Sequence, residues 1–237
     1  MQDKQMALGS HLDEARKRLL VALSSFVILS CLSFFFVQDI LRVLKIPAGD
    51  ALGTLSVFSP TAAILSFIKM GVAGGLILST PIFLYQIWMF VRPAMEDRAA
   101  RLGVWFVLFG TLLLLSGGVF SYFFILPASL KFLLSVGRGE LQFLISLDSY
   151  VSFVLLILLG GGAIFQMPLV VLVLSKIGVI TAGQMIRGWR IAIVVILILA
   201  AFLTPTPDLV NLSLMALPMM VLYIISIGIA KFSEKKK

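Results

Sequence analysis

Two carboxylates stand beside three cations directly before the first long apolar run of the chain. Asp13 and Glu14 precede Arg16, Lys17 and Arg18, and no other residue but Ala15 separates the two groups. At the edge of a lipid bilayer, a carboxylate needs a positive partner to offset its loss of hydration. That partner is either one of the three neighbouring cations or a cation that another molecule supplies.

The interiors of the apolar runs lack the groups that enzymes and ion-coupled pumps use. None of the 11 acidic residues lies in the middle of a run, and the single histidine, His11, precedes the first run. Proton-coupled transporters usually carry a carboxylate or histidine inside the membrane, and intramembrane hydrolases need a nucleophile with a base, or a metal set. We therefore expect no enzyme activity, no catalytic residue, no metal and no cofactor.

Gln166 is the one large polar side chain deep in an apolar run. Pro168 cannot donate a hydrogen bond to the carbonyl of Ile164. Gln166 either satisfies that freed carbonyl or hydrogen-bonds a partner helix or a passing chain. The three glycines at 160–162 form either a close-packing patch or a hinge. Packing is favoured, because glycines without a neighbouring helix would only weaken their own helix.

The bulk composition indicates a membrane protein. The chain has 237 residues, of which 60% are hydrophobic and 13% charged, and its mean hydropathy is +1.11. Soluble domains contain roughly 45–50% apolar residues. The net charge of +8 comes from basic residues at the ends of apolar runs, so we expect no nucleic-acid partner. The single cysteine, Cys31, excludes an intrachain disulfide.

Six apolar runs are candidates for membrane-spanning helices, each of which needs about 20 residues. They are residues 19–37, 61–91, 102–126, 149–175, 190–204 and 210–230. The fifth run is short, and Pro205 and Pro207 end it. It needs either local thinning of the bilayer or a partner helix.

The basic residues predict the orientation. Fourteen of the 19 Lys and Arg residues fall on one side of the six spans, which places both termini in the cytoplasm. We divide the chain into a cytoplasmic segment at 1–18, a membrane domain at 19–230 and a basic tail at 231–237. Two outer loops, at 38–60 and 127–148, each begin with an amphipathic stretch. The first stretch is closed by Pro47, the second surrounds Leu130 to Val136, and ordinary loop packing is the alternative for both.

An ordered series of short motifs resembles the TatC family, the multispanning core of the twin-arginine protein translocase. The resemblance runs from about residue 8 to 231. Its parts are the strip His11–Leu19, Phe58-Ser59-Pro60, the stretch Pro81–Phe90 with Arg92-Pro93-Ala94, Phe120–Phe123 with Leu126-Pro127, Ser149–Phe153, Phe165–Pro168, Thr204–Asp208 and Ala216-Leu217-Pro218.

The resemblance implies an all-α, cupped bundle of six transmembrane helices, kinked at Pro81, Pro168 and Pro218, in a bacterial-type cytoplasmic membrane. It implies a receptor for signal peptides with two consecutive arginines, which exports folded cargo at the expense of the proton-motive force. The implied partners are single-span proteins resembling TatA and TatB, with several copies per complex. The alternative function is a secondary transporter or channel for small molecules, which would need a polar path across the bilayer.

The resemblance also implies binding residues. Glu14 matches the family's recognition glutamate, and Asp13 and Arg16 flank it. The position of the family's second recognition glutamate holds Ala99. Glu96 and Asp97 precede it by about one turn. These two acids either replace that glutamate or cap the third helix.

Polar residues near the outer end of the last two spans are candidates for contacts with a partner helix. They are Thr204, Asp208 and Asn211, and Gln166 is another candidate. Many family members carry an acid at the position of Gln166 and at that of Ile224, and this chain is neutral at both.

Overall fold

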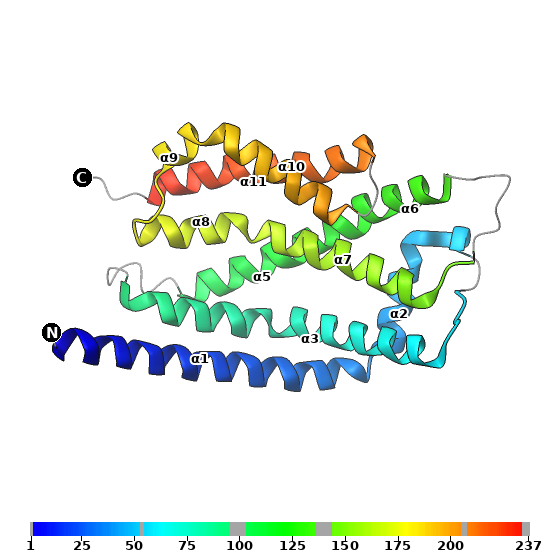
Figure 1. Cartoon of the computed structure of the whole chain (residues 1–237), viewed down its shortest axis with the longest axis horizontal. Helices are drawn as coiled ribbons and strands as arrows, with labels where there is room; N and C mark the ends of the chain where they lie inside the picture. The colour runs from blue at the N-terminus through cyan, green and yellow to red at the C-terminus, as the bar shows by residue number, and fades with distance from the viewer. Residues whose placement is uncertain (1, 53–54, 95–102, 136–143, 205–207, 234–237) are drawn as a thin grey trace.

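The computed structural model describes residues 2–52, 55–94, 103–135, 144–204 and 208–233. Its helices run back and forth along one axis, and the first and last helices place both chain ends at the same end of the bundle (Figure 1). The six crossings are α1 (Gln2–Phe34), α3 (Pro60–Val91), α5 (Gly103–Phe120) continued by η3 (Ser121–Ile125) and α6 (Leu126–Ser135), α7 (Leu147–Phe165) continued by α8 (Met167–Lys176), α10 (Trp189–Leu203) and α11 (Leu209–Ser233). The shorter elements are α2 (Val37–Lys45), η1 (Ile46–Leu52), η2 (Arg92–Ala94) and α9 (Ala182–Arg187).

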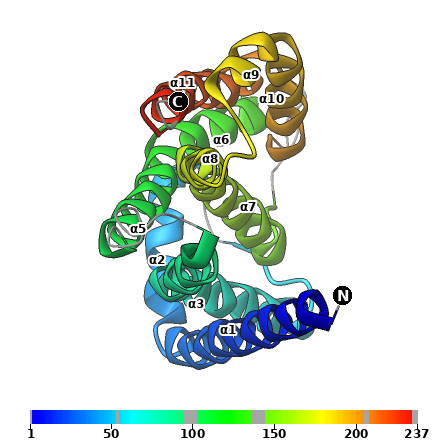
Figure 2. The ribbon, with the colours of Figure 1, turned by 90° about the vertical axis from the view of Figure 1, so that its left-hand side faces the viewer.

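The expected all-α membrane fold is confirmed. Within the described ranges, five helical segments are long and apolar enough to cross a membrane, and α10 is a shorter apolar helix. Viewed along the bundle, α1 and α3 form one group, α9, α10 and α11 form another, and α5, α7 and α8 lie between them (Figure 2). The division at residues 18 and 230 stays a prediction, and α1 runs without interruption through the first of these positions.

The first crossing is a long helix that packs along α3 and leaves most of its surface to lipid. An added Cβ at Gly71 of α3 would approach Phe34 Cδ2 to 3.0 Å, so small residues allow the two helices to lie close together. The opposite face of α1 is exposed, as at Leu19 and Ile28. The helix begins before the apolar run, and the strip at 11–18 is therefore helical rather than a loop.

The glycines at 160–162 form a packing patch, as predicted. An added Cβ at Gly161 would lie 3.1 Å from the carbonyl oxygen of Gly117 on α5, and one at Gly162 would lie 3.2 Å from that of Leu114. On another face, Gly160 approaches Leu203 of α10, with 2.7 Å from an added Cβ to Leu203 Cδ2. The three positions therefore hold α7 against two neighbouring helices.

The third predicted span and the amphipathic stretch expected after it form one continuous helical segment. Residues 127–135 belong to α6, and the segment runs from Gly103 to Ser135. The preceding residues, Ser121–Ile125, form a π-helical turn. A π turn is wider than an α turn, and it makes room for Pro127, whose ring would otherwise press on the preceding turn.

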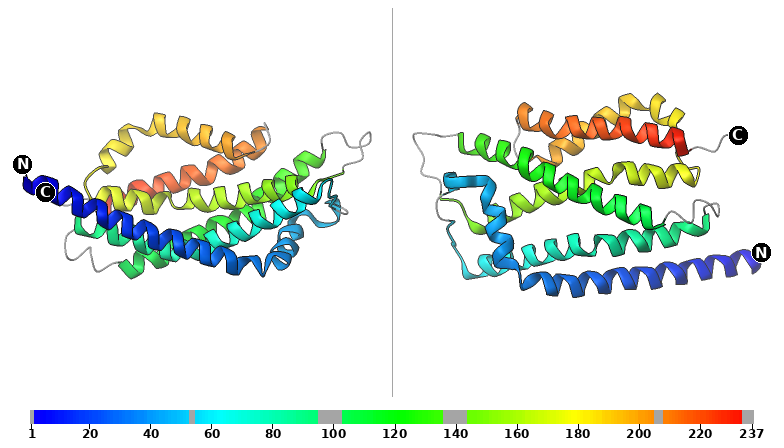
Figure 3. Two further views of the ribbon diagram at one scale, coloured as in Figure 1. Left: turned by 60° about the horizontal axis from the view of Figure 1, so that its bottom comes forward. Right: turned by 180° about the vertical axis from the view of Figure 1, so that it is seen from behind.

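The outer end of the bundle is closed by α2, which runs across it (Figure 3). Tyr122 donates a hydrogen bond to the carbonyl of Val43 at 2.7 Å, and Tyr150 donates to that of Leu44 at 2.6 Å. The α-helix ends at Lys45, two residues before the predicted stop at Pro47, and Pro47 itself lies in the 3-10 helix η1 that follows. The two outer loops meet through backbone hydrogen bonds between Ser56 and the segment around Ser146.

The three predicted kink positions differ in local structure. Pro168 stands just after the break between α7 and α8. Pro81 and Pro218 lie inside the continuous helices α3 and α11, and kinks at these two positions stay predictions. Beside Pro81, the hydroxyl of Thr80 donates to the carbonyl of Leu76 at 2.9 Å.

Candidate functional site

The acidic strip lies on one face of α1 and forms a recess with α3. The recess has a volume of about 510 Å³ and lies toward the end of the bundle where α1 begins and α3 ends (Figure 1). Helical spacing brings Asp13 and Glu14 over Lys17 and Arg18. Gln86 of α3 completes the wall of the recess. We name this recess the rim site.

Glu14, the main acid of the rim site, forms an ion pair with Arg18 of the same helix. Arg18 Nε donates to Glu14 Oε1 at 3.0 Å, and Arg18 Nη2 donates to the same oxygen. The Glu14 side chain is 35% exposed and that of Arg18 is 20% exposed. A pair at this spacing and exposure contributes only about 0.3–0.5 kcal/mol, so another cation can exchange with Arg18. Asp13 and Arg16 are exposed beside it.

Glu96, Asp97 and Ala99 lie outside the described residues. The choice between recognition and helix capping for the two acids therefore stays open. The segment that holds them joins Ala94 of η2 to the start of α5.

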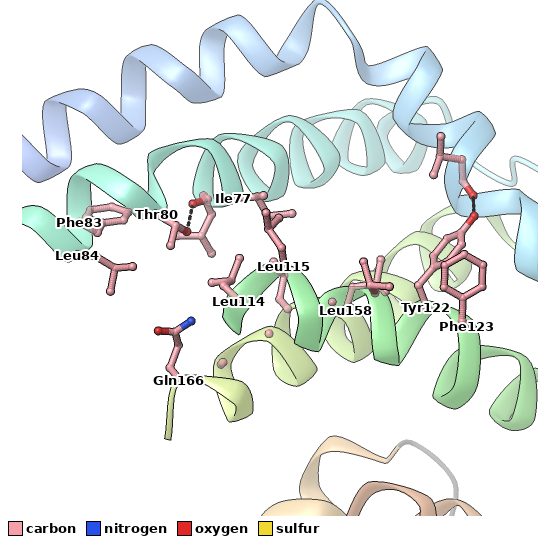
Figure 4. Close-up of a pocket in the computed structure, with 17 residues that line it drawn as sticks. Ile77, Thr80, Phe83, Leu84, Leu114, Leu115, Tyr122, Phe123, Leu158 and Gln166 are labelled. Atoms are coloured by element: carbon pink, nitrogen blue, oxygen red, sulfur yellow. Dashed lines mark hydrogen bonds between the residues drawn. The ribbon is translucent and has the colours of Figure 1, made fainter. Parts of the chain in front are cut away.

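A second polar position lies in the membrane, in a groove lined by α3, α5 and α7. The groove has a volume of about 650 Å³ and is almost entirely apolar. Gln166 stands at one end of it and points toward Leu84 and Leu114 (Figure 4). Its amide nitrogen Nε2 donates to the carbonyl of Gly110 on α5 at 2.8 Å.

The interpretation that the Gln166 side chain satisfies the carbonyl freed by Pro168 is therefore wrong. The amide bonds a neighbouring helix of the same chain instead. Its oxygen Oε1 is buried and has no hydrogen-bond partner among the residues that the structure describes. A buried amide oxygen without a partner is costly, and it can accept a hydrogen bond from a group that enters the groove.

The third set of predicted residues lies near the link between α10 and α11. Asp208 caps α11, since its Oδ2 accepts from the backbone N–H of Asn211 at 2.8 Å and its Oδ1 accepts from Asn211 Nδ2 at 3.0 Å. Thr204 donates to the carbonyl of Ala200 at 2.8 Å. Both Thr204 and Asn211 are buried. The structure thus places the predicted residues in three separate regions: the rim site, the groove and this link.

The structure also reveals a polar cluster that was not predicted. Lys69 of α3 donates to Asp148 Oδ1 of α7 at 2.6 Å and to Ser152 Oγ at 2.8 Å. A cation inside a long apolar run needs an anion nearby, so Lys69 was the signal that this cluster exists. The identity of its partner depends on how α3 and α7 pack. In the described part of the chain, no group of His, Cys, Asp and Glu is placed to hold a metal ion.

Comparisons with known proteins agree with this arrangement. The family model described as "Sec-independent protein translocase protein (TatC)" matches residues 10–218. The TatC protein of Aquifex aeolicus (strain VF5) is 36% identical over 236 residues, which cover 98% of each chain. TatCy of Bacillus subtilis (strain 168) is 30% identical over 237 residues, covering 100% of this chain and 93% of that protein.

A solved structure shares the fold. The crystal structure of the twin arginine translocase receptor TatC superposes with a TM-score of 0.81 at 36% identity, covering 94% of this chain and 99% of that chain. The match at this identity extends over all six crossings described above. The chain therefore belongs to the TatC family of Sec-independent protein translocase proteins.

Proposed function

We propose that the rim site binds signal peptides that carry two consecutive arginines, and that this binding starts the export of folded cargo. As a TatC protein, the chain is a core subunit of the twin-arginine translocase and a multi-pass protein of the cytoplasmic membrane. It is a translocase component rather than an enzyme or a transporter of small molecules. The proposal concerns which of its residues recognise the peptide.

The observation that carries the proposal is the half-buried Glu14 in a recess that already holds a guanidinium. Arg18 donates from two nitrogens to one oxygen of Glu14, so the recess is shaped for a charge-assisted contact of this kind. A guanidinium is planar and permanently charged, and it binds a carboxylate with several donors at once. An arginine of the peptide takes the place of Arg18 on Glu14.

The second arginine of the peptide binds a second acid. Asp13 is exposed beside Glu14 and is available to it. Glu96 and Asp97 are further candidates for this role.

We further propose that single-span partners resembling TatA and TatB bind the membrane-embedded surface. Gln166 offers the buried oxygen of its amide to a donor on a helix in the groove. The outer end of α10 and the start of α11, with Thr204, Asp208 and Asn211, form a second contact. Transport is driven by the proton-motive force.

The test compares a peptide carrying Arg-Arg with its Lys-Lys counterpart, bound to the full chain in lipid nanodiscs. Glu14→Gln should weaken Arg-Arg binding by about 10-fold or more, since a hydrogen bond to a charged group contributes about 1.5–3 kcal/mol. It should also abolish the preference for arginine over lysine. Glu14→Lys should eliminate crosslinking of the peptide.

Asp39→Asn is the matched control. Asp39 pairs with Arg42 at 3.0 Å on α2, an exposed ion pair at the opposite end of the bundle. Its removal should leave peptide binding unchanged. If Glu14→Gln binds the Arg-Arg peptide as tightly as the unaltered chain does, Glu14 is not in the recognition site.

A further inference from the structure

A second apolar groove lies between α5 and α11, on another side of the bundle from the groove of Gln166. It has a volume of about 620 Å³. Its floor is formed by Leu169 and Leu172 of α8, and its walls by Trp105 and Phe109 of α5 and Ile225 of α11. The three wall residues are 57%, 55% and 48% exposed, respectively. The groove is therefore open to whatever surrounds the bundle.

The groove occupies the depth of the cytoplasmic leaflet. It lies next to the end of the bundle that holds both termini, where α5 begins and where α8 and α11 end (Figure 3). On α5 it extends from Trp105 to Leu113, which is about 12 Å along a helix. One leaflet of hydrocarbon is about 15 Å deep. An acyl chain of that leaflet thus matches the groove in depth and direction.

One cation stands at the open cytoplasmic end of this groove. Lys176, in the last turn of α8, is the only charged residue that lines it among the described residues. The described part of the chain shows no carboxylate paired with its ammonium group. The ammonium lies at the level of lipid headgroups, where basic residues between transmembrane helices bind anionic phospholipids, and the indole of Trp105 belongs to the aromatic belt at the same level.

We propose that this groove is a binding site for one anionic phospholipid of the cytoplasmic leaflet. Its phosphate contacts the Lys176 ammonium, and one acyl chain lies in the groove against Leu169, Leu172 and Phe109. The positive charge of Lys176 at the cytoplasmic end of the groove selects an anionic headgroup, and the apolar walls bind the acyl chain. The residues that line this groove and those that line the rim site have no member in common.

Tryptophan fluorescence tests the proposal, because two of the three tryptophans, Trp88 and Trp105, line the groove. The full chain with Trp189→Phe is reconstituted in vesicles that contain phosphatidylglycerol or phosphatidylcholine with brominated acyl chains, which quench a nearby indole. Phosphatidylglycerol should show about a fivefold preference for the site, which corresponds to roughly 1 kcal/mol for one lysine.

Substitutions identify the residue that gives this preference. Lys176→Gln should abolish it, and Lys176→Arg, which keeps the positive charge, should retain it. Lys131→Gln, which removes an exposed cation from α6 at the outer end, should have no effect. Equal quenching by both lipids in the chain that keeps Lys176 would mean ordinary surrounding lipid only and would overturn the proposal, as would a preference that persists in Lys176→Gln.

Discussion

Arg18 acts as an internal substitute for the arginine that we propose the rim site receives. It lies one helical turn after Glu14, and the two side chains form a pair at the edge of the recess. The pair keeps a half-buried carboxylate neutralised when no peptide is bound. Because the pair is only partly buried, its contribution is small, and a peptide can displace Arg18 at little cost.

Removal of Arg18 should therefore strengthen peptide binding. Arg18→Gln removes one competitor for Glu14, and the affinity for an Arg-Arg peptide should rise about twofold, since a partly exposed pair at this spacing contributes about 0.3–0.5 kcal/mol. The gain should shrink at high salt, because salt screens the competing charge. Fluorescence anisotropy of a labelled peptide at two salt concentrations measures both effects.

Arg42→Gln at the outer end is the control, since it breaks a similar pair on α2 that no peptide approaches. It should leave the affinity unchanged. Weaker binding in Arg18→Gln would show instead that Arg18 itself holds the peptide or shapes the recess.

The sequence identifies the acids of the rim site but not how they are paired. The spacing of Glu14 and Arg18 predicts that a pair is possible, and the resemblance suggests an external ligand. Only the packing of α1 against α3 adds Gln86 to the same recess. The pair of Lys69 and Asp148 has the same origin, because its members are 79 positions apart in the chain.

Among the elements, α5 and α7 meet in a close seam, as α1 and α3 also do. Their backbones meet where Gly117 faces Gly161, and an added Cβ at Gly117 would lie 2.6 Å from the carbonyl oxygen of Gly161. The next residue, Gly118, has open space around an added Cβ. An alanine substitution at each of these two glycines therefore distinguishes two effects on stability: the loss of close packing at Gly117 and the change in helix propensity alone at Gly118.

Gly117→Ala should destabilise the chain by about 1–3 kcal/mol, because the methyl group meets backbone that cannot move aside. Gly118→Ala, whose methyl group meets open space, should not destabilise the chain and should stabilise it by up to about 1 kcal/mol, because alanine favours the helix more than glycine does. Thermal unfolding in detergent compares the two. Equal effects of both substitutions would contradict the close approach of α5 and α7.

Hydropathy was sufficient to locate the six crossings, since apolar length alone decides which segments can span a bilayer. It did not show that the third crossing continues without a break into α6, because that continuity depends on the π turn that accommodates Pro127. It also missed α9, a helix of one to two turns whose start is fixed by a capping box of Thr181 and Gln184. Such features depend on local hydrogen bonds rather than on apolar length.

At the scale of the whole molecule, the helices on the two sides of the bundle differ in length across the membrane. The helix α3 has 32 residues and α10 has 15, which correspond to about 48 Å and 22 Å. The hydrocarbon core of a bilayer is about 30 Å thick. At its cytoplasmic end α10 carries Trp189 with Arg190 over its ring at 5.7 Å, a combination that anchors a helix at the interface.

With that end anchored, the bilayer must thin beside α10. Phe202 follows Trp189 by 13 positions and therefore lies about 20 Å from it along the helix. It is 80% exposed. In a bilayer of ordinary thickness, Phe202 would stay well inside the hydrocarbon, but in a thinned one it reaches the outer interface.

Spin labels distinguish the two cases in vesicles that contain the full chain with Cys31→Ala. A label at Phe202→Cys should be accessible to a water-soluble nickel complex, because thinning brings the outer interface down to it. A label at Ile198→Cys, one turn deeper and also exposed, should be accessible mainly to oxygen, which dissolves in hydrocarbon. If both labels respond mainly to oxygen, the bilayer keeps its thickness beside α10, and the short helix ends inside the membrane. The described residues on either side of the link, Thr204 and Asp208, would then lie in hydrocarbon, where polar groups have no water to bind, and a partner helix would have to cover them.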